Sequence, residues 1–366
     1  MNQQFIDELT ELIEVKTPSY DFKSLHQILE KCKQKISKTK SITIESFEKD
    51  GIPSLLAYNS KSRPKKFKII LNGHLDVVPA KLDQYKVNID GNLLYGRGSI
   101  DMKSAALVLM NVFCELAPKL PYSIALQLVT DEETGGMFGT GHQVEMGVDA
   151  DFVLGGDITN MTLDYQSKGI CNATVEVQGH NAHSAYLWRG KNAILKLMAG
   201  IDSLLTAYPI PSSEDWVTTA NISQISTRNK VLNKVPDNAK VALDIRFVQN
   251  DPNFSSFEST QNYLEAVFPE STVSIDQFQP GVYCPPDNPQ IQKLVQSYKD
   301  ITGQDITLVR RHGSSDMRFY TYKGIPCVSF GPKGNDHHGD NEYLELDSIE
   351  PYYQTIKKFL LDTHDK

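Results

Sequence analysis

The sequence lacks the features that mark several classes of protein. The net charge is −8 and no dense Lys/Arg stripe is present, so a nucleic-acid partner, which needs a basic face, is not expected. The densest basic stretch, KSRPKKFK at 61–68, is typical of a solvated approach to a strand. No run of about 18 apolar residues predicts a membrane span, and no repeat or long Gly/Ser linker is present.

Two further features predict a cytoplasmic location. The N-terminal stretch 1–15 spaces its apolar residues along one helical face with acids between them, which indicates an amphipathic helix rather than a signal peptide. The cysteines are odd in number, far apart and without a CxxC pair, which favours reduced thiols over a disulfide framework. They are Cys32, Cys114, Cys171, Cys284 and Cys327.

Apolar patterning predicts an α/β fold. A chain of 366 residues is long for a single core, so we expect two domains. Four short, nearly continuous apolar runs end in Gly, His, Asp or Glu, as buried parallel strands with functional groups at their carboxyl ends do. These runs are KFKIILNGH (66–74), SIALQLVTDEE (123–133), DFVLGGD (151–157) and IPCVSFG (325–331). Helical spacing at 103–116 and 288–301 predicts crossover helices on a mixed sheet.

The middle of the chain has a different pattern. Strand-like stretches at 171–179, 217–225, 239–248 and 271–278 enclose helix-like stretches at 192–208 and 257–267. The order βαββαβ is that of a ferredoxin-like unit. We therefore expect an inserted α+β domain at 172–282, flanked by the two halves of a larger domain, 1–171 and 283–366.

The first candidate ligands lie at the end of the first buried strand and in the loop that follows. In GHLDVVP, Asp76 lies two residues after His74 and can hold its second imidazole nitrogen, as the outer support of a metal-bound histidine does. In GRGSIDMKSAA, Asp101 stands just before a predicted helix. By itself Asp101 would be a helix-capping residue, so a ligand role depends on other donors nearby.

Those donors follow at the other strand ends. VTDEETGG places Asp131, Glu132 and Glu133 together, and three converging acids without a cation would repel one another and resist ionisation. Asp157 ends DFVLGGD, and GNDHHGDNEYL offers a histidine pair, His337 and His338. Oxygen and imidazole donors at the strand ends of one α/β domain predict a metal site.

The order of these motifs resembles that of a known family. GHLDVVP, YGRGSIDMKSA, TDEETGG, VLGGD and FGP followed by HHGDNEYL are similar to the motifs of acetylornithine deacetylase, succinyl-diaminopimelate desuccinylase, glutamate carboxypeptidase and related cocatalytic zinc aminopeptidases and dipeptidases. The resemblance covers essentially the whole chain. It implies a mixed-sheet zinc-peptidase-like catalytic domain, an inserted ferredoxin-like lid and dimerisation domain, and a homodimer.

The resemblance also implies roles for the candidate ligands. His74 and Asp157 would hold one zinc ion, Glu133 and His338 the other, and Asp101 would bridge them. Glu132 would be the general base, and Asp76 would orient His74. His338 fits better than His337 because Asn341 and Glu342 follow it at the family's spacing. Zn²⁺ is the expected metal, although these ligands also suit Co²⁺ or Mn²⁺.

The expected chemistry follows from these parts. Paired divalent ions lower the pKa of a water molecule between them and polarise the scissile carbonyl. Glu132 then takes the proton from that water and passes it to the leaving amine.

Further candidates would contact the substrate. His183, in GHNAHSAYLWRGKNA, matches a family histidine that donates to the carbonyl oxygen as charge develops there, and the resemblance leaves open whether it acts within its own subunit or across a dimer. Arginines suit the bidentate capture of a substrate carboxylate, with ordinary surface pairing as the alternative. The remaining substrate-binding candidates are Asn233, Arg246, Ser314, Ser315 and Arg318.

The motifs leave the substrate open. Segments YCPPDN and SSDMRF resemble the deacetylase and desuccinylase branch, whereas Asp157 stands where that branch usually has Glu and is more typical of aminopeptidases and dipeptidases. The family's GHSS-like segment is altered to AHSA, and STRN replaces its usual Gly pair. We expect cleavage of a small N-acyl amino acid, with a dipeptidase, aminopeptidase or carboxypeptidase as the alternative. A non-catalytic binder on the same fold and a phosphoester hydrolase are the other hypotheses.

Overall fold

The computed structural model describes residues 3–363 and divides the chain into two compact units. The larger unit comprises the described residues up to Gln166, Val282–Arg310 and the chain from Ser315 onward, and the smaller unit comprises Ser167–Gly281 with Arg311–Ser314. The inserted domain expected from the sequence, 172–282, did not include Arg311–Ser314. These residues join the smaller unit because Arg311 O accepts the backbone N–H of Lys168 at 3.2 Å and His312 packs against Trp216.

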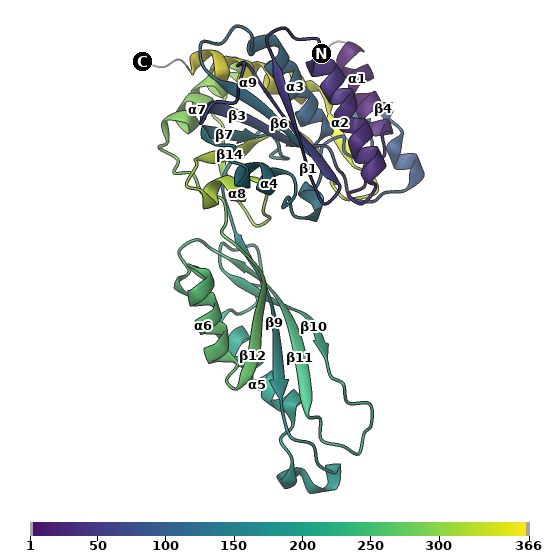
Figure 1. The fold of residues 1–366 in the computed structure, drawn as a ribbon, viewed down its shortest axis with the longest axis vertical. Helices are drawn as coiled ribbons and strands as arrows, with labels where there is room; N and C mark the ends of the chain where they lie inside the picture. The colour runs from purple at the N-terminus through teal and green to yellow at the C-terminus, as the bar shows by residue number, and fades with distance from the viewer. Residues whose placement is uncertain (1–2, 364–366) are drawn as a thin grey trace. The chain divides into compact units, whose positions relative to one another are not determined.

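The larger unit is built on a mixed sheet of eight strands (Figure 1). Its four central neighbours, β6, β3, β7 and β14, are mutually parallel, and the strands at both sides pair antiparallel to them. The strands, in spatial order, are β1 (Thr43–Lys49), β2 (Ile52–Tyr58), β6 (Ile124–Val129), β3 (Phe67–His74), β7 (Ala150–Gly155), β14 (Cys327–Phe330), β8 (Leu163–Ser167) and β13 (Leu308–Arg311).

Side chains alternate between two apolar cores on the two faces of this sheet. In β3, Ile69 and Leu71 enter the core on one face, whereas Ile70 enters the core on the other. The first core is covered by α1 (Gln3–Glu14), α2 (Phe22–Ile36), α3 (Lys103–Leu116), α7 (Pro289–Thr302) and α9 (Ile349–Asp362), and the second by α4 (Thr140–Glu145) and α8 (Met317–Tyr322). Burial on both faces explains why the central strands are continuous apolar runs.

The smaller unit is the predicted ferredoxin-like fold. Its elements follow the order βαββαβ, and its sheet has the strand order β10-β11-β9-β12 with all neighbours antiparallel. Helix α5 packs on β9 and β11, and α6 packs on β12. The elements are β9 (Gly169–Gln178), α5 (Ala193–Ala207), β10 (Thr219–Ser226), β11 (Asn238–Phe247), α6 (Phe257–Val267) and β12 (Ser271–Gln279).

A third, small sheet was not predicted, because strands of two or three residues carry no periodic signal. It has the order β15-β16-β5-β4 and joins β15 (Gly334–Asn335), β16 (Tyr343–Glu345), β5 (Leu93–Tyr95) and β4 (Asn88–Asp90). Short 3₁₀ helices complete the chain: η1 (Leu82–Tyr85), η2 (Glu132–Thr134), η3 (Ser184–Arg189), η4 (Pro252–Phe254) and η5 (Leu346–Ser348). Within residues 3–363, no helix combines the length and apolarity needed to cross a membrane.

A buried lysine ties α3 to the end of α1. The side chain of Lys103 is fully buried, and its Nζ donates to the carbonyl oxygens of Leu12 and Val15, at 2.9 Å each. Lys103→Met keeps the approximate shape but leaves both carbonyls without a donor, so we expect the free energy of unfolding to fall by about 2 to 4 kcal/mol. Urea denaturation followed by circular dichroism measures this change.

Lys49 supplies the control for this substitution. Its Nζ lies 2.9 Å from Glu145 at the surface, and Lys49→Met should change stability by less than about 0.5 kcal/mol. Equal effects of the two substitutions would contradict the structural role given to Lys103.

Candidate metal centre

The candidate ligands lie at one edge of the eight-stranded sheet. Strands β6, β3, β7 and β14 are neighbours and run parallel, so their carboxyl ends meet at the same edge. His74 ends β3, and Asp157 follows β7 by two residues. Glu132 and Glu133 follow β6 in η2, and His338 lies in the loop between β15 and β16, after β14. The topology therefore brings together side chains that are far apart in the sequence.

One group of donors contains a histidine and two aspartates. His74, Asp101 and Asp157 each offer an atom, and these atoms all lie within 4.8 Å of one another. His74 Nε2 is 3.1 Å from Asp101 Oδ1. His74 and Asp101 are buried, whereas Asp157 is partly exposed.

A second group shares Asp101 with the first. Asp101, Glu133 and His338 also offer atoms within 4.8 Å of one another. His338 Nε2 lies 3.1 Å from Asp101 Oδ2 and 3.0 Å from Glu133 Oε2. The two oxygens of Asp101 therefore face two different histidines, which is the arrangement of a carboxylate between two cation positions.

Asp76 holds the loop that carries two of the acids. Its carboxylate is fully buried and accepts the backbone N–H groups of Glu132 and Glu133, at 3.2 and 3.1 Å. One of its oxygens lies 3.4 Å from His74 Nδ1, and Ser19 Oγ donates to the other. Asp76 thus links the histidine to the Glu132–Glu133 segment, a connection that the sequence spacing alone did not reveal.

Glu342 fixes the loop that carries Asp101. The Glu342 carboxylate is buried and accepts the backbone N–H groups of Ile100 and Asp101, both at 3.1 Å. Arg97 donates to its other oxygen at 2.6 Å and to Gly339 O at 2.9 Å. The same ion pair therefore connects the Asp101 loop with the segment next to His338.

Asp131 does not enter either donor group among the described residues, although it stands beside Glu132. Its Oδ2 accepts the backbone N–H groups of Phe138 and Gly139, at 2.7 and 3.0 Å. Burial and the nearby Asp316 raise the pKa of Asp131 to about 7. Of the three consecutive acids, Asp131 closes the loop and only Glu133 enters a donor group.

The electrostatics of the site are those of opposite charges held close together. The carboxylates of Asp101 and Glu133 accept hydrogen bonds from the His338 imidazole, and this raises the pKa of His338 to about 10. Burial opposes protonation of His74, but the same kind of contact to Asp101 and Asp76 raises its pKa well above the usual range. For Asp101, burial favours the neutral acid, but the two histidines outweigh it and lower the pKa.

Glu132 lies beside the donor groups, and the charges of His74 and Arg318 only partly offset the effect of its burial. Burial, together with the charges of Asp316 and Asp157, raises its pKa well above the usual range against the opposing effect of His74. Burial also raises the pKa of Glu133. Acids in this state are ionised most readily when a cation is bound beside them.

The donor set fits two divalent ions of the zinc type. Imidazole nitrogens and carboxylate oxygens bind Zn²⁺ at about 2.0 to 2.2 Å, so ligand atoms of one ion lie within about 4.4 Å of one another. In both groups the donor atoms lie within 4.8 Å of one another, which is close to this limit; both groups mix nitrogen with oxygen, and they meet at a shared carboxylate. His338 rather than His337 is the histidine that enters the second group, as the motif spacing predicts.

The other predicted contacts divide between the two units. His183, Asn233, Arg246 and Ser314 belong to the smaller unit. There, the exposed His183 accepts the N–H of Ala185 through Nδ1, and Ser184 N donates to Asn233 O at 3.0 Å, so the segments of His183 and Asn233 lie side by side. Arg246 donates to both oxygens of Asp244, at 2.8 and 3.2 Å. Ser314 Oγ is buried without a hydrogen-bond partner among the described residues.

Ser315 and Arg318 belong to the larger unit. Ser315 O accepts the N–H of Arg318 as α8 begins. The Arg318 side chain is only 4% exposed and donates through NH2 to Gly135 O at 2.6 Å. Its guanidinium is therefore already engaged with the protein, which the sequence could not indicate.

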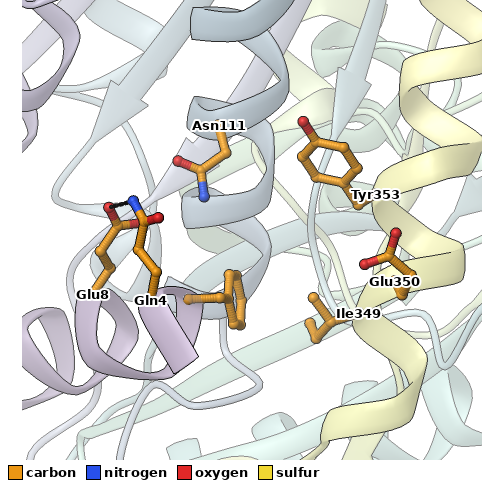
Figure 2. A pocket seen from close by; sticks show the side chains of 7 residues that line it. Gln4, Glu8, Asn111, Ile349, Glu350 and Tyr353 are labelled. Carbon is orange, nitrogen blue, oxygen red and sulfur yellow. Dashed lines mark hydrogen bonds between the residues drawn. The ribbon is translucent and has the colours of Figure 1, made fainter. Parts of the chain in front are cut away.

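One cavity of the larger unit lies away from the two donor groups. A cavity of about 610 Å³ lies between α1, α3 and α9 (Figure 2). Gln4, Glu8, Asn111 and Glu350 are among the side chains that line it, and none of the candidate site residues does. This cavity therefore gives no support to the candidate site.

Comparison with known proteins decides the family. The model of Peptidase family M20/M25/M40 matches residues 70–362, which is well over half of the chain. The chain belongs to peptidase family M20/M25/M40. It is accordingly a metal-dependent hydrolase, and the family resemblance of its motifs is confirmed.

Relatives within M20/M25/M40 include both deacylases and peptidases. A succinyl-diaminopimelate desuccinylase of Sphingopyxis alaskensis is 28% identical over 330 residues, covering 84% of each chain. The aminopeptidase PepT of Bacillus cereus has a similar fold, with a TM-score of 0.79 at 17% identity over 98% of both chains. A Bacillus subtilis protein described as a dinuclear metal-binding M20 peptidase has a TM-score of 0.71 at 14% identity over 99% of both chains.

Metal uptake should depend steeply on pH. At neutral pH, below the His338 pKa of about 10, the His338 imidazole carries a proton that a metal ion must displace, and the carboxylates that raise the pKa of His74 act in the same direction. We expect the apparent affinity for Zn²⁺ to rise between pH 6 and 9, by about tenfold per pH unit for each proton released. Titration calorimetry in buffers of different ionisation enthalpy counts the protons, and a pH-independent affinity without proton release would contradict this electrostatic description.

Proposed function

We propose that this M20/M25/M40 enzyme hydrolyses the amide bond of an N-acyl amino acid. The observation that carries the proposal is the pair of donor groups that share Asp101, with Glu132 directly beside the donor Glu133. Such a site can place two cations next to one carboxylate that is not itself a ligand, and this arrangement suits metal-assisted hydrolysis of an amide.

In this proposal, His74 and Asp157 hold one ion, Glu133 and His338 hold the other, and Asp101 bridges them. Two divalent ions, when bound, would lower the pKa of water and polarise the scissile carbonyl. We take Zn²⁺ as the ion because the nitrogen and oxygen donors suit it, while Co²⁺ and Mn²⁺ are alternatives that the same donors accept.

Glu132 acts as general base and then as general acid. Its backbone N–H is held by Asp76, so the side chain has a fixed origin beside the donor groups. A buried carboxylate with a raised pKa accepts a proton from water readily and can then deliver it to the leaving amine. Asp76 orients His74 and the Glu132–Glu133 segment together.

The substrate class rests on the desuccinylase relatives and on a positive side chain in the smaller unit. Arg246 keeps a planar guanidinium at a half-buried position on β11, where a substrate carboxylate would compete with Asp244 for it. Asp157 supports a second candidate, dipeptide hydrolysis, because aspartate at that position is more typical of the aminopeptidase and dipeptidase branch. Asn233, Ser314 and Ser315 are the further proposed contacts.

A single substitution at Glu132 tests whether this residue is the general base. Glu132→Gln keeps the shape of the side chain but cannot take a proton, so we expect kcat to fall by about 10² to 10⁴-fold with both metal ions retained. The measurement is turnover of a panel of acetyl, succinyl and dipeptide substrates by zinc-loaded protein, with metal content determined in parallel. A phosphoester in the same panel tests the alternative metal chemistry.

Two results would count against the proposal. Activity that survives Glu132→Gln undiminished would mean that another group is the base. A metal-loaded protein that cleaves no amide in the panel would favour a binding protein on the same fold, and turnover confined to dipeptides would favour the second candidate.

We further propose that the chain forms a homodimer through the smaller unit, with His183 supplying a donor to the carbonyl oxygen in a site. Strand β10 is an edge of its sheet, and edge strands offer unpaired backbone groups to a second copy. Leu195 and Met198 on α5 are 63% and 55% exposed, and Ile225 on β10 is 58% exposed. Apolar side chains so exposed are typical of a surface that a second protein chain covers.

A cytoplasmic location remains a prediction from the reduced thiols.

Two charged substitutions test the dimer. Leu195→Glu with Met198→Glu should shift the mass measured by sedimentation from dimer to monomer, because charges at the centre of an apolar contact are costly to bury. If His183 acts across the dimer, the kcat of the variant with Leu195→Glu and Met198→Glu should fall by about the same factor as the kcat of His183→Ala. A wild-type monomer with full activity would contradict the proposal.

A further inference from the structure

The turn that follows β6 carries both Glu132 and Glu133 and is held from two sides. On one side, Asp76 accepts the backbone N–H groups of both glutamates. The turn then closes on itself through Gly136 N, which donates to Asp131 O at 2.7 Å. The carbonyl oxygen of Gly135, the residue before Gly136, accepts a hydrogen bond from Arg318 NH2 at 2.6 Å. Asp76 thus fixes the N–H groups of the turn, and Arg318 fixes its far end.

Arg318 is itself fixed at the start of α8. Asp316 Oδ1 lies 3.8 Å from Arg318 NH1, and Asp316 Oδ2 accepts the hydroxyl of Thr140, the first residue of α4, at 2.6 Å. The guanidinium also lies 4.5 Å from the centre of the Phe319 ring. Both charged side chains are at least nine-tenths buried. The pair therefore bonds to the chain before and after the segment 136–139.

The space between the turn and α8 admits no side chain. Gly136 has φ +60, and a Cβ placed on it would lie 1.9 Å from Asp316 Oδ1 and 2.9 Å from Phe319 Cε2. The backbone of the turn therefore rests directly on the Asp316 carboxylate. A contact this close transmits a shift of α8 to the turn, because packed groups cannot absorb it.

We propose that Arg318 and Asp316 are positioning residues, which set the Glu132–Glu133 turn for metal binding and proton transfer. This inference rests on the proposed function, and it replaces the capture of a substrate carboxylate as the role of Arg318. Both terminal nitrogens of the guanidinium face protein oxygens, NH2 at Gly135 and NH1 at Asp316. A substrate carboxylate would have to displace these contacts inside a buried site.

Arg318→Ala tests the inference, and Arg318→Lys is the conservative variant. The two roles predict opposite changes in metal affinity. Loss of a nearby positive charge alone would strengthen cation binding, whereas a displaced Glu133 should weaken it, by about 10 to 100-fold as for other groups that orient metal ligands. Competition with a chelator at fixed pH gives the affinity for Co²⁺ or Zn²⁺.

Hydrogen exchange in the metal-free protein supplies a readout that is independent of activity. We expect the amides of residues 132–139 to exchange about tenfold faster in Arg318→Ala, because the turn loses its outer hydrogen bond. Arg318→Lys should recover part of both effects, since an ammonium can still donate to Gly135 O. Turnover of an amide substrate should show kcat lowered by at least about tenfold with KM nearly unchanged.

Arg63→Ala is the matched control. Arg63 also donates from NH2 to a backbone carbonyl, that of Met146 at 3.0 Å, and pairs with Glu45, but it does not contact the turn. It should leave metal affinity, exchange at 132–139 and kcat unchanged. A rise in KM with unaltered kcat, metal affinity and exchange in Arg318→Ala would overturn the inference, as would a rise in metal affinity or no change at all.

The experiment also separates this inference from the proposed function. Should wild-type protein bind two metal ions and cleave no amide, the proposed function fails. Metal affinity and exchange would still decide the role of Arg318.

Discussion

Carboxylates that converge at the edge of a parallel sheet repel one another, and the rest of the site is arranged around this repulsion. Asp101, Glu133 and Asp157 approach the same place from different loops, and Glu132 stands beside them. Burial makes the repulsion costly because little water screens it. The imidazoles of His74 and His338 lie against these carboxylates, which raise the pKa of both histidines. Divalent ions would offset the repulsion, which is why the donor set suits a pair of them.

Backbone groups set the positions of these charges. Asp76 and Glu342 are not in either donor group, yet each accepts two N–H groups from a segment that carries donors. Carboxylates that bind backbone amides in this way fix loops more firmly than side-chain pairs, since the amides cannot rotate away. Arg97 and Arg318 complete the support by donating to carbonyls near His338 and Glu133. The residues of the two donor groups are therefore positioned by buried charged side chains that bind the backbone around them.

Much of this arrangement could be predicted from the sequence, for physical reasons. The continuous apolar runs predicted parallel strands because both faces of the sheet are covered, and the helical spacing at 103–116 matches α3 residue for residue. The members of the two donor groups were predictable because they lie at or after strand ends and carry motifs. The period-two and helical patterns of the middle region likewise matched the ferredoxin-like unit. Other features have no local signal. The backbone contacts of Asp76, the packing of Asp316 on Gly136 and the attachment of Arg311–Ser314 to the smaller unit depend on segments that meet only in the folded chain.

Anomalous scattering from zinc-loaded crystals can determine whether two cations share the Asp101 carboxylate. Two peaks are expected at the zinc edge, about 3.5 to 4 Å apart on either side of the Asp101 carboxylate. One peak should contact His74 and Asp157, and the other Glu133 and His338. The absence of peaks at this edge of the sheet, or a single peak that does not touch Asp101, would contradict this arrangement.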